Sequence, residues 1–142
     1  MTIRQSHKHF TGCLLGGAIG DALGAPIEFM SLERIRQIHG TEGVTGYCEF
    51  RNEQGEFTDD TQMTLFTAEG LLRANHRAIL KGIGGATLPI TFQSYQRWLF
   101  TQGLKANSIP DGWGVHDLEN GWLIREKGLF KQRAPGNSCI SS

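Results

Sequence analysis

The sequence contains few cysteines, and their spacing argues against a covalently stapled protein. Cys13, Cys48 and Cys139 are the 3 cysteines among 142 residues. An odd number at wide spacing fits neither a disulfide framework nor a CxxC zinc site. Such cysteine usage is typical of a reducing compartment, and we expect a cytoplasmic protein.

Excess charge and long apolar runs are also missing from the sequence. Fourteen basic residues balance fourteen acidic ones, so no net field attracts nucleic acid or an anionic membrane, and we expect neither as a partner. No uninterrupted apolar run approaches the roughly 20 residues that cross a bilayer. The polar start, residues 1–9, lacks the apolar stretch of a signal peptide. The sequence therefore predicts a soluble intracellular protein, and its length is typical of one domain.

Glycine, in contrast, recurs with a helical period near the start of the chain. Gly12, Gly16, Gly20 and Gly24 are spaced by four residues, which places them on one face of a helix predicted over residues 10–24. Each glycine inside a helix costs about 1 kcal/mol relative to alanine. The stripe therefore predicts that another backbone packs closely on this face. A phosphate-binding loop is the alternative, although no GxxxxGK[ST] pattern follows.

The next segment contains the signals of a short helix and an irregular connection. Ala25-Pro26 should end the first helix, because the residue before proline avoids the helical conformation. Ser31 is a suitable N-cap for a helix through His39, and Gly40 stands where a helix often ends. Residues 41–57 are polar and glycine-bearing, and residues 44–47 form at most a short strand.

Two longer helices are predicted in the rest of the chain. The first follows Thr58 and runs to about Asn75, and its apolar residues should form the buried face: Leu65, Ala68 and Leu72, broadened by Met63 and Phe66. Residues 80–88 read as a loop, and Pro89 opens a second helix that ends near Gly103. A short helix is expected at 120–130 and a turn at 134–137. Without repeats or heptads, the sequence predicts an all-α fold with long loops.

The chemistry concentrates at the start of the helix after Thr58. Thr58, Asp59 and Asp60 offer a hydroxyl and two carboxylates, which are the hard oxygen donors that Mg²⁺, Mn²⁺ or Ca²⁺ prefer. The same residues also suit a helix start, because threonine caps the amides and aspartates offset the helix dipole. Thr61 stands where a capping box requires Glu or Gln. Both interpretations remain open at this point.

Glu28 is a second candidate for the same site. It lies between Ile27 and Phe29 in the turn that follows the glycine-striped helix. A carboxylate between two apolar residues either points to solvent or has a functional role. The five histidines form no pair at helical ligand spacing apart from His7 and His9, and we assign them no catalytic role. Nothing marks Cys13 or Cys48 as an activated nucleophile.

Three blocks of sequence resemble the ADP-ribosylglycohydrolase family. They are Gly20-Asp21-Ala22-Leu23-Gly24-Ala25-Pro26-Ile27-Glu28, then Phe57-Thr58-Asp59-Asp60-Thr61-Gln62-Met63, and finally Arg133-Ala134-Pro135-Gly136-Asn137-Ser138-Cys139. The blocks follow the family order across nearly the whole chain, and the Thr-Asp-Asp-Thr-Gln-Met block is highly specific.

The resemblance implies an all-α hydrolase that removes ADP-ribose from a modified protein side chain or from a small ADP-ribose derivative. Two Mg²⁺ or Mn²⁺ ions are implied between helices, with Thr58, Asp59 and Asp60 as metal ligands. By the same resemblance, Glu28 and Asp60 would act catalytically, Glu28 by binding metal or positioning the attacking water, and Asp21 would have a structural role. Backbone amides at Gly136, Asn137 and Ser138 are candidates for holding the pyrophosphate.

One departure from the family pattern qualifies this function. Family members are about twice as long, and their second half adds an Asp-x-Asp-Thr motif, whereas the five aspartates here include no Asp-x-Asp. Residues 1–142 are therefore expected to be the amino-terminal portion of a single domain, supplying part of the metal site. The alternative is a truncated, non-catalytic remnant that serves as a binding or structural module. Either form could self-associate through the surface left by the missing half.

Overall fold

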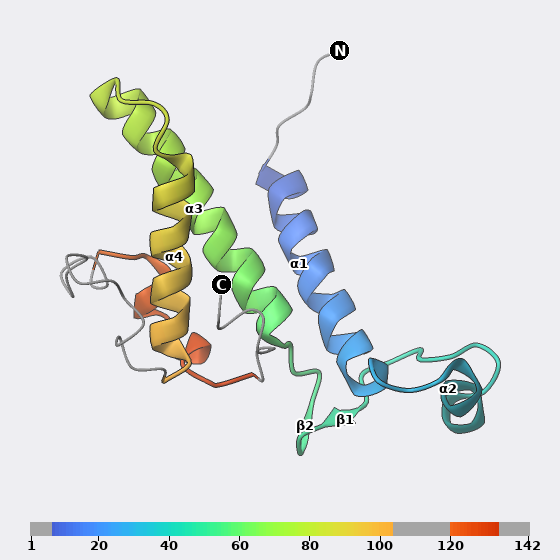
Figure 1. Cartoon of the computed structure of the whole chain (residues 1–142). Helices are drawn as coiled ribbons and strands as arrows, with labels where there is room; N and C mark the ends of the chain where they lie inside the picture. The colour runs from blue at the N-terminus through green and yellow to red at the C-terminus, as the bar shows by residue number, and fades with distance from the viewer. Residues whose placement is uncertain (1–6, 104–119, 134–142) are drawn as a thin grey trace, which may run out of the picture. The chain divides into compact units, whose positions relative to one another are not determined.

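The computed structural model describes residues 7–103 and 120–133. Its described elements are helices joined by loops, with one two-stranded sheet (Figure 1), which confirms the all-α class. The chain divides into two compact units, Met1–Thr61 and Gln62–Ser142, and each is described by itself.

The first unit begins with the predicted glycine-rich helix. α1 runs from His7 to Gly24, and the one-turn 3-10 helix η1, Ala25–Ile27, follows where Pro26 was expected to end it. α2 spans Leu32–His39. The Ser31 hydroxyl accepts a hydrogen bond from the Arg34 amide at 3.2 Å, and Gly40 follows with φ at 79°. The predicted N-cap and terminating glycine of this helix are therefore both confirmed.

The connection after α2 contains a small hairpin in place of the strand expected at 44–47. β1, Glu49–Phe50, pairs with β2, Glu53–Gln54, in antiparallel register. The two turn residues, Arg51 and Asn52, have φ of 53° and 66°, as a tight two-residue turn requires. Residue 47 stays outside the ladder, and its carbonyl instead accepts a hydrogen bond from the Gln54 side chain at 2.8 Å.

Within the described part of the first unit, the close packing predicted for the glycine stripe of α1 is not formed. A Cβ added at Gly12, Gly16, Gly20 or Gly24 would meet no atom within 4 Å. Ala22 is the one residue of α1 that is buried. Helical spacing of small residues permits close packing, but it does not by itself provide the second backbone.

The expectation that no segment is long and apolar enough to cross a membrane is also corrected. The 21-residue segment His7–Ile27, which contains an 18-residue window of mean hydropathy 1.3, meets that test by length and composition alone. Glycine and alanine residues separate the leucines and isoleucines, so the mean hydropathy of the segment is high although it contains no long run of large apolar residues. Core helices of soluble proteins and signal sequences near an N-terminus pass the same test.

The second unit is built on two long helices. α3 spans Asp59–Lys81, so its first three residues belong to the first unit and the rest to the second, and α4 spans Thr87–Thr101. α3 continues past the predicted end near Asn75, because helix-compatible residues extend to Lys81 and Gly82 then adopts φ of 65°. The short helix predicted at 120–130 is instead two 3-10 turns, η4, Leu123–Arg125, and η5, Lys127–Leu129.

The buried face of α3 differs from the predicted one. Phe66 is fully buried as expected, but Leu72 is 58% exposed and Leu65 and Ala68 are half-buried. The face that is buried also contains Gln62, Glu69, Gly70 and Ala74. Gly70 lies against α4 so closely that an added Cβ would be 2.7 Å from the Thr91 Cα. Backbone approach at this glycine, rather than the leucine periodicity, determines which face packs.

Polar side chains fill the interior between α3, α4 and the 3-10 turns. The Gln62 carbonyl accepts hydrogen bonds from the Trp98 indole at 3.1 Å and the Gln102 amide at 3.0 Å. The Gln62 amide donates to the carbonyls of Leu129, at 3.3 Å, and Lys131, at 3.1 Å. This network joins the 3-10 turns to the helix pair, and it satisfies polar groups that would be costly to bury alone.

Candidate functional site

The candidate site is the first turn of α3, where Thr58 caps the helix. The Asp60 amide donates to the Thr58 hydroxyl oxygen at 3.3 Å, which is the bond expected from the second helical residue to an N-cap side chain. Asp59 is half-buried and Asp60 is exposed. The capping interpretation of Thr58 is therefore correct, and it leaves the two aspartates projecting from a fixed helix start.

In a capping box, the side chain of the third helical residue accepts a hydrogen bond from the backbone amide of the N-cap residue. Here Asp21, on α1, supplies that acceptor. Its carboxylate accepts hydrogen bonds from the Thr58 amide at 2.8 Å and the Thr58 hydroxyl at 2.7 Å. It also accepts from the Thr61 amide at 3.2 Å and the Thr61 hydroxyl at 2.5 Å. Thr58 and Thr61 are each 8% exposed. Asp21 thus has the structural role expected of it, and Thr61 is a participant that the sequence argument treated only as an absent Glu.

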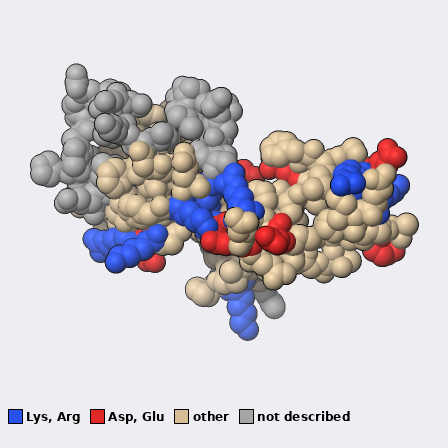
Figure 2. Space-filling view, turned by 90° about the horizontal axis from the view of Figure 1, so that it is seen from below, with Lys and Arg blue, Asp and Glu red and all other residues tan. Residues whose placement is uncertain are grey.

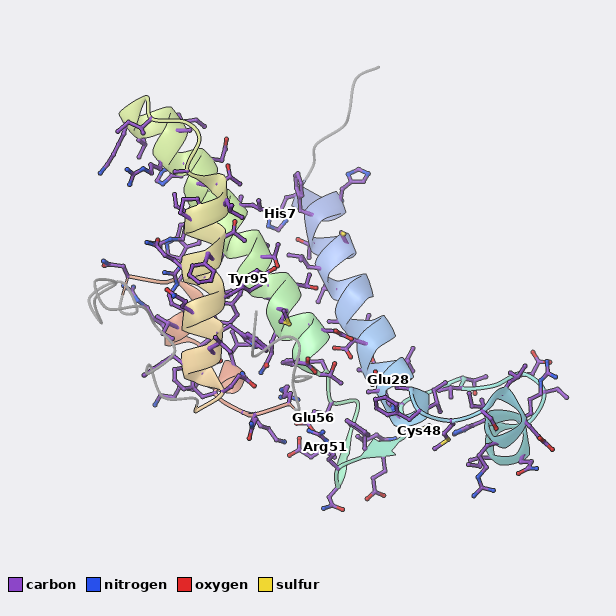
Figure 3. All side chains as sticks on the ribbon, in the orientation of Figure 1. His7, Glu28, Cys48, Arg51, Glu56 and Tyr95 are labelled. Atoms are coloured by element: carbon purple, nitrogen blue, oxygen red, sulfur yellow. The ribbon has the colours of Figure 1, made fainter. Side chains whose placement is uncertain are left out.

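Burial and three neighbouring carboxylates affect the ionisation of Asp59 at this turn. The pKa of Asp59 is raised above 3.8, chiefly because burial disfavours the charged form; a hydrogen bond from its own backbone amide opposes the shift, and the charges of Asp60, Asp21 and Glu28 add to it. Glu28 is exposed and lies just beyond α1 (Figure 3). The electrostatic effect of Glu28 on Asp59 places the two carboxylates in one neighbourhood.

The acidic side chains do not form a ready metal cage. Among residues 7–103 and 120–133, no group of three or more His, Cys, Asp or Glu side chains is arranged to hold a metal ion. Nor does any Lys, Arg or His in that part of the chain form an ion pair with Asp21, Glu28, Asp59 or Asp60. Among the described residues, the turn therefore concentrates negative charge without an ion-pair partner, and the predicted ligand roles remain predictions.

The predicted pyrophosphate contacts at Gly136, Asn137 and Ser138 lie outside the described residues. Arg133, the first residue of that sequence block, is described, and its amide donates to the Gln102 side chain at 3.3 Å. Across the face drawn in Figure 2, Lys and Arg are interspersed with Asp and Glu, so neither sign dominates that face as a whole.

A family model described as ADP-ribosylglycohydrolase matches residues 3–142. The ADP-ribosyl-[dinitrogen reductase] glycohydrolase of Rhodospirillum rubrum is 42% identical over 72 residues, which are 50% of this chain and 24% of that protein. The ADP-ribosylarginine hydrolase Tri1 of Serratia proteamaculans is 40% identical over 63 residues, 44% of this chain and 16% of that protein. The uncharacterized protein YegU of Escherichia coli is 32% identical over 125 residues, 80% of this chain and 37% of that protein.

The matched part of this chain therefore corresponds to well under half of the length of each of these relatives. No solved structure matches the chain. The family match covers nearly every residue, including the Thr-Asp-Asp-Thr block whose geometry is described above, and the chain belongs to the ADP-ribosylglycohydrolase family.

Proposed function

We propose that this chain supplies the metal-binding portion of a hydrolase that cleaves the glycosidic bond of ADP-ribosylated substrates. The observation that carries the proposal is the group of carboxylates at the first turn of α3, which forms no ion pair with the described cationic side chains. Burial is the main cause of the raised pKa of Asp59, and the charges of Asp60, Asp21 and Glu28 add to it. Two relatives are named as hydrolases of ADP-ribosylated dinitrogen reductase and of ADP-ribosylarginine. The proposed substrate class is an ADP-ribosylated protein or a small ADP-ribose derivative, in the cytoplasm.

Mg²⁺ or Mn²⁺ fits the donor set of this turn in chemistry, although the set is incomplete in number. Carboxylate and hydroxyl oxygens are the ligands that these ions prefer. A divalent cation would also stabilise the charged form of Asp59, which burial and the repulsion of three neighbouring charges disfavour. Near-octahedral coordination of two ions requires more oxygens than Thr58, Asp59, Asp60 and Glu28 provide. Water or residues beyond those described would supply the others.

Each residue of the turn has a separate task in this proposal. Asp59 and Asp60 would hold the metal through their carboxylates. Thr58 donates its hydroxyl proton to Asp21, so its oxygen retains lone pairs for the Asp60 amide and for a cation. Glu28, exposed at the end of α1, would accept a proton from the attacking water. When bound, the metal lowers the pKa of water and orients the ribose hydroxyls.

Manganese titration of the chain tests the proposal most directly. We expect weak Mn²⁺ binding by calorimetry and a large loss of that binding in Asp60→Ala, because a carboxylate ligand is removed. Glu33→Gln is the matched control, since Glu33 is an exposed carboxylate at the start of α2. It should leave Mn²⁺ binding unchanged.

Release of ADP-ribose from ADP-ribosylated arginine gives the second measurement. The chain alone should turn over poorly, because an incomplete site cannot hold the ribose close to the attacking water and loses much of the rate that positioning supplies. Joining it to the remaining portion of the Rhodospirillum rubrum relative should restore turnover, and Asp60→Ala should remove it again. Equal Mn²⁺ binding by wild type and Asp60→Ala would contradict the metal assignment. A joined protein that binds Mn²⁺ without turnover would favour the non-catalytic binding module.

A further inference from the structure

We propose that Asp21 is the positioning residue for the acidic pair: through Thr58 and Thr61 it fixes the turn from which Asp59 and Asp60 project. The expected effect of Asp21 on metal affinity rests on the proposed function. The geometric content of the inference stands on the hydrogen bonds alone.

The arrangement of the four hydrogen bonds carries the argument. Asp59 and Asp60 lie between Thr58 and Thr61 in the sequence, and the carboxylate of Asp21 holds both flanking residues by amide and by hydroxyl. The amides at a helix start have no partner within the helix. Because one rigid group accepts from both ends of the Thr58–Thr61 segment, the backbone directions of the two aspartates are fixed together.

The origin of the acceptor matters as much as the number of bonds. An ordinary capping box uses side chains of the same helix, whereas Asp21 comes from α1, 37 residues before Thr58 in the sequence. The segment containing Glu28 follows directly on α1 through η1. A single carboxylate therefore links the element that precedes Glu28 to the turn that presents Asp59 and Asp60. Hydrogen-bonded groups behind metal ligands generally set ligand orientation.

Asp21 also contributes negative charge, and the two effects can be separated by substitution. In Asp21→Asn, the amide oxygen can replace the oxygen that accepts from the Thr58 amide, the Thr61 amide and the Thr61 hydroxyl. The amide nitrogen can then donate to the Thr58 hydroxyl, which is free to rotate. The asparagine variant keeps the hydrogen-bonded geometry and loses the charge, whereas Asp21→Ala loses both.

The experiment compares wild type, Asp21→Ala, Asp21→Asn and Thr61→Val in the full chain, with Ser31→Ala as the matched control. Ser31 caps α2 in the same unit through its bond to Arg34, so its loss should destabilise without touching the start of α3. Amide hydrogen exchange of Thr58, Asp60 and Thr61 is measured by NMR without metal, and Mn²⁺ affinity by calorimetry at a temperature where every variant is folded.

We expect Asp21→Ala to accelerate exchange of the Thr61 amide at least about tenfold, since a hydrogen bond to a charged acceptor is lost. It should also weaken Mn²⁺ binding roughly 10- to 100-fold. Asp21→Asn should restore most of the slow exchange but only part of the Mn²⁺ affinity, because the Thr58 oxygen then accepts a second hydrogen bond and has no lone pair left for the cation. Thr61→Val, which loses one of the four bonds, should have an intermediate exchange rate. If Asp21→Ala does not fold, Asp21→Asn and Thr61→Val decide the question by the same two measurements.

Unchanged exchange in Asp21→Ala would overturn the proposal, as would a loss of Mn²⁺ affinity no greater than that of Ser31→Ala. If Asp21→Asn lost as much affinity as Asp21→Ala while keeping the slow exchange, the charge of Asp21 rather than its geometry would govern binding. A wild-type chain without Mn²⁺ binding would remove metal dependence from the proposed function. The exchange rates would then still decide whether Asp21 fixes the turn.

Discussion

Asp21 in the first unit and Glu69 in the second each hold a distant segment through backbone hydrogen bonds, but among the described residues only Glu69 also forms ion pairs. Each carboxylate accepts two backbone amides from a distant segment: Asp21 from Thr58 and Thr61, and Glu69 from Trp122 at 3.1 Å and Leu123 at 3.3 Å. Glu69 is also paired with Arg97 at 3.4 Å and with Arg73 at 3.8 Å. No such ion pair reaches Asp21 in the described part of the chain.

The presence or absence of an ion pair distinguishes Glu69, which stabilises the fold, from the carboxylates at the start of α3, which we propose bind a cation. The side chains of Glu69 and Arg97 are 1% and 2% exposed, so each satisfies a charge that would otherwise be costly to bury. Around the start of α3, burial raises the pKa of Asp59, and the charges of Asp60, Asp21 and Glu28 add to that shift, with no ion pair to these carboxylates among the described residues. Uncompensated charge is a cost to the folded chain, and it becomes useful when a cation binds.

The largest effect is expected when the balanced carboxylate is neutralised. Glu69→Gln keeps the shape of the side chain but leaves the charge of Arg97 buried without its carboxylate, which should cost about 3–5 kcal/mol of unfolding free energy. Asp21→Asn, the matched change in the other unit, should cost clearly less because it strands no cation. Urea denaturation measures both. Equal losses in the two variants would show that the ion pairs do not distinguish these carboxylates.

A smaller change in unfolding free energy is expected when alanine replaces a glycine, and its sign should depend on whether the glycine is crowded. In Gly70→Ala the new Cβ would lie 2.7 Å from the Thr91 Cα, and because that neighbour is backbone, overpacking should cost about 1–3 kcal/mol. Gly16→Ala is the control, since nothing lies within 4 Å of its Cβ position. It should stabilise α1 by roughly 0.5–1 kcal/mol through better helix propensity. Destabilisation by Gly16→Ala, seen in thermal melts, would restore the close packing first predicted for the stripe.

These glycines also show how far the sequence could predict the fold. Local signals were sufficient for Ser31 and Gly40, because a cap and a terminating glycine act on neighbouring residues. The glycine stripe of α1 and the leucine periodicity of α3 predicted the buried helix faces less well, because burial depends on which other segment of the chain packs against the helix. Gly70 has no periodic partner in the sequence, yet it is the glycine at which α3 and α4 meet most closely.

The candidate site was predictable to a similar degree. Thr58, Asp59 and Asp60 could be proposed as a site from residue type and position at a helix start, and their roles as ligands stay predictions; the charge of Glu28 is the last of the causes that raise the pKa of Asp59. The hydrogen bonds from Thr58 and Thr61 to Asp21 join residues 37 and 40 positions apart. A contact at that separation leaves no spacing pattern, so sequence reasoning assigned Asp21 a structural role without its partners.

The last prediction concerns the cost of the unbalanced charge at Asp59. Because its pKa is raised in the folded chain, the stability associated with its neutral form is fully present below the unfolded value of 3.8 and is lost as pH rises through the folded value. Asp59→Asn does not titrate and cannot incur that loss. Its melting temperature should match wild type at about pH 3.5 and exceed it at about pH 7, without metal.

Added Mn²⁺ should reverse the order, because the cation stabilises a carboxylate that binds it and gains little from the amide. Glu33→Gln, which removes an exposed carboxylate from α2, controls for the change in net charge. The same advantage at neutral pH in Glu33→Gln would assign the effect to net charge rather than to the carboxylates around α3. A melting temperature of Asp59→Asn that stayed equal to wild type at every pH would mean that the start of α3 carries no electrostatic cost. The case for a cation at this turn would then lose its main support.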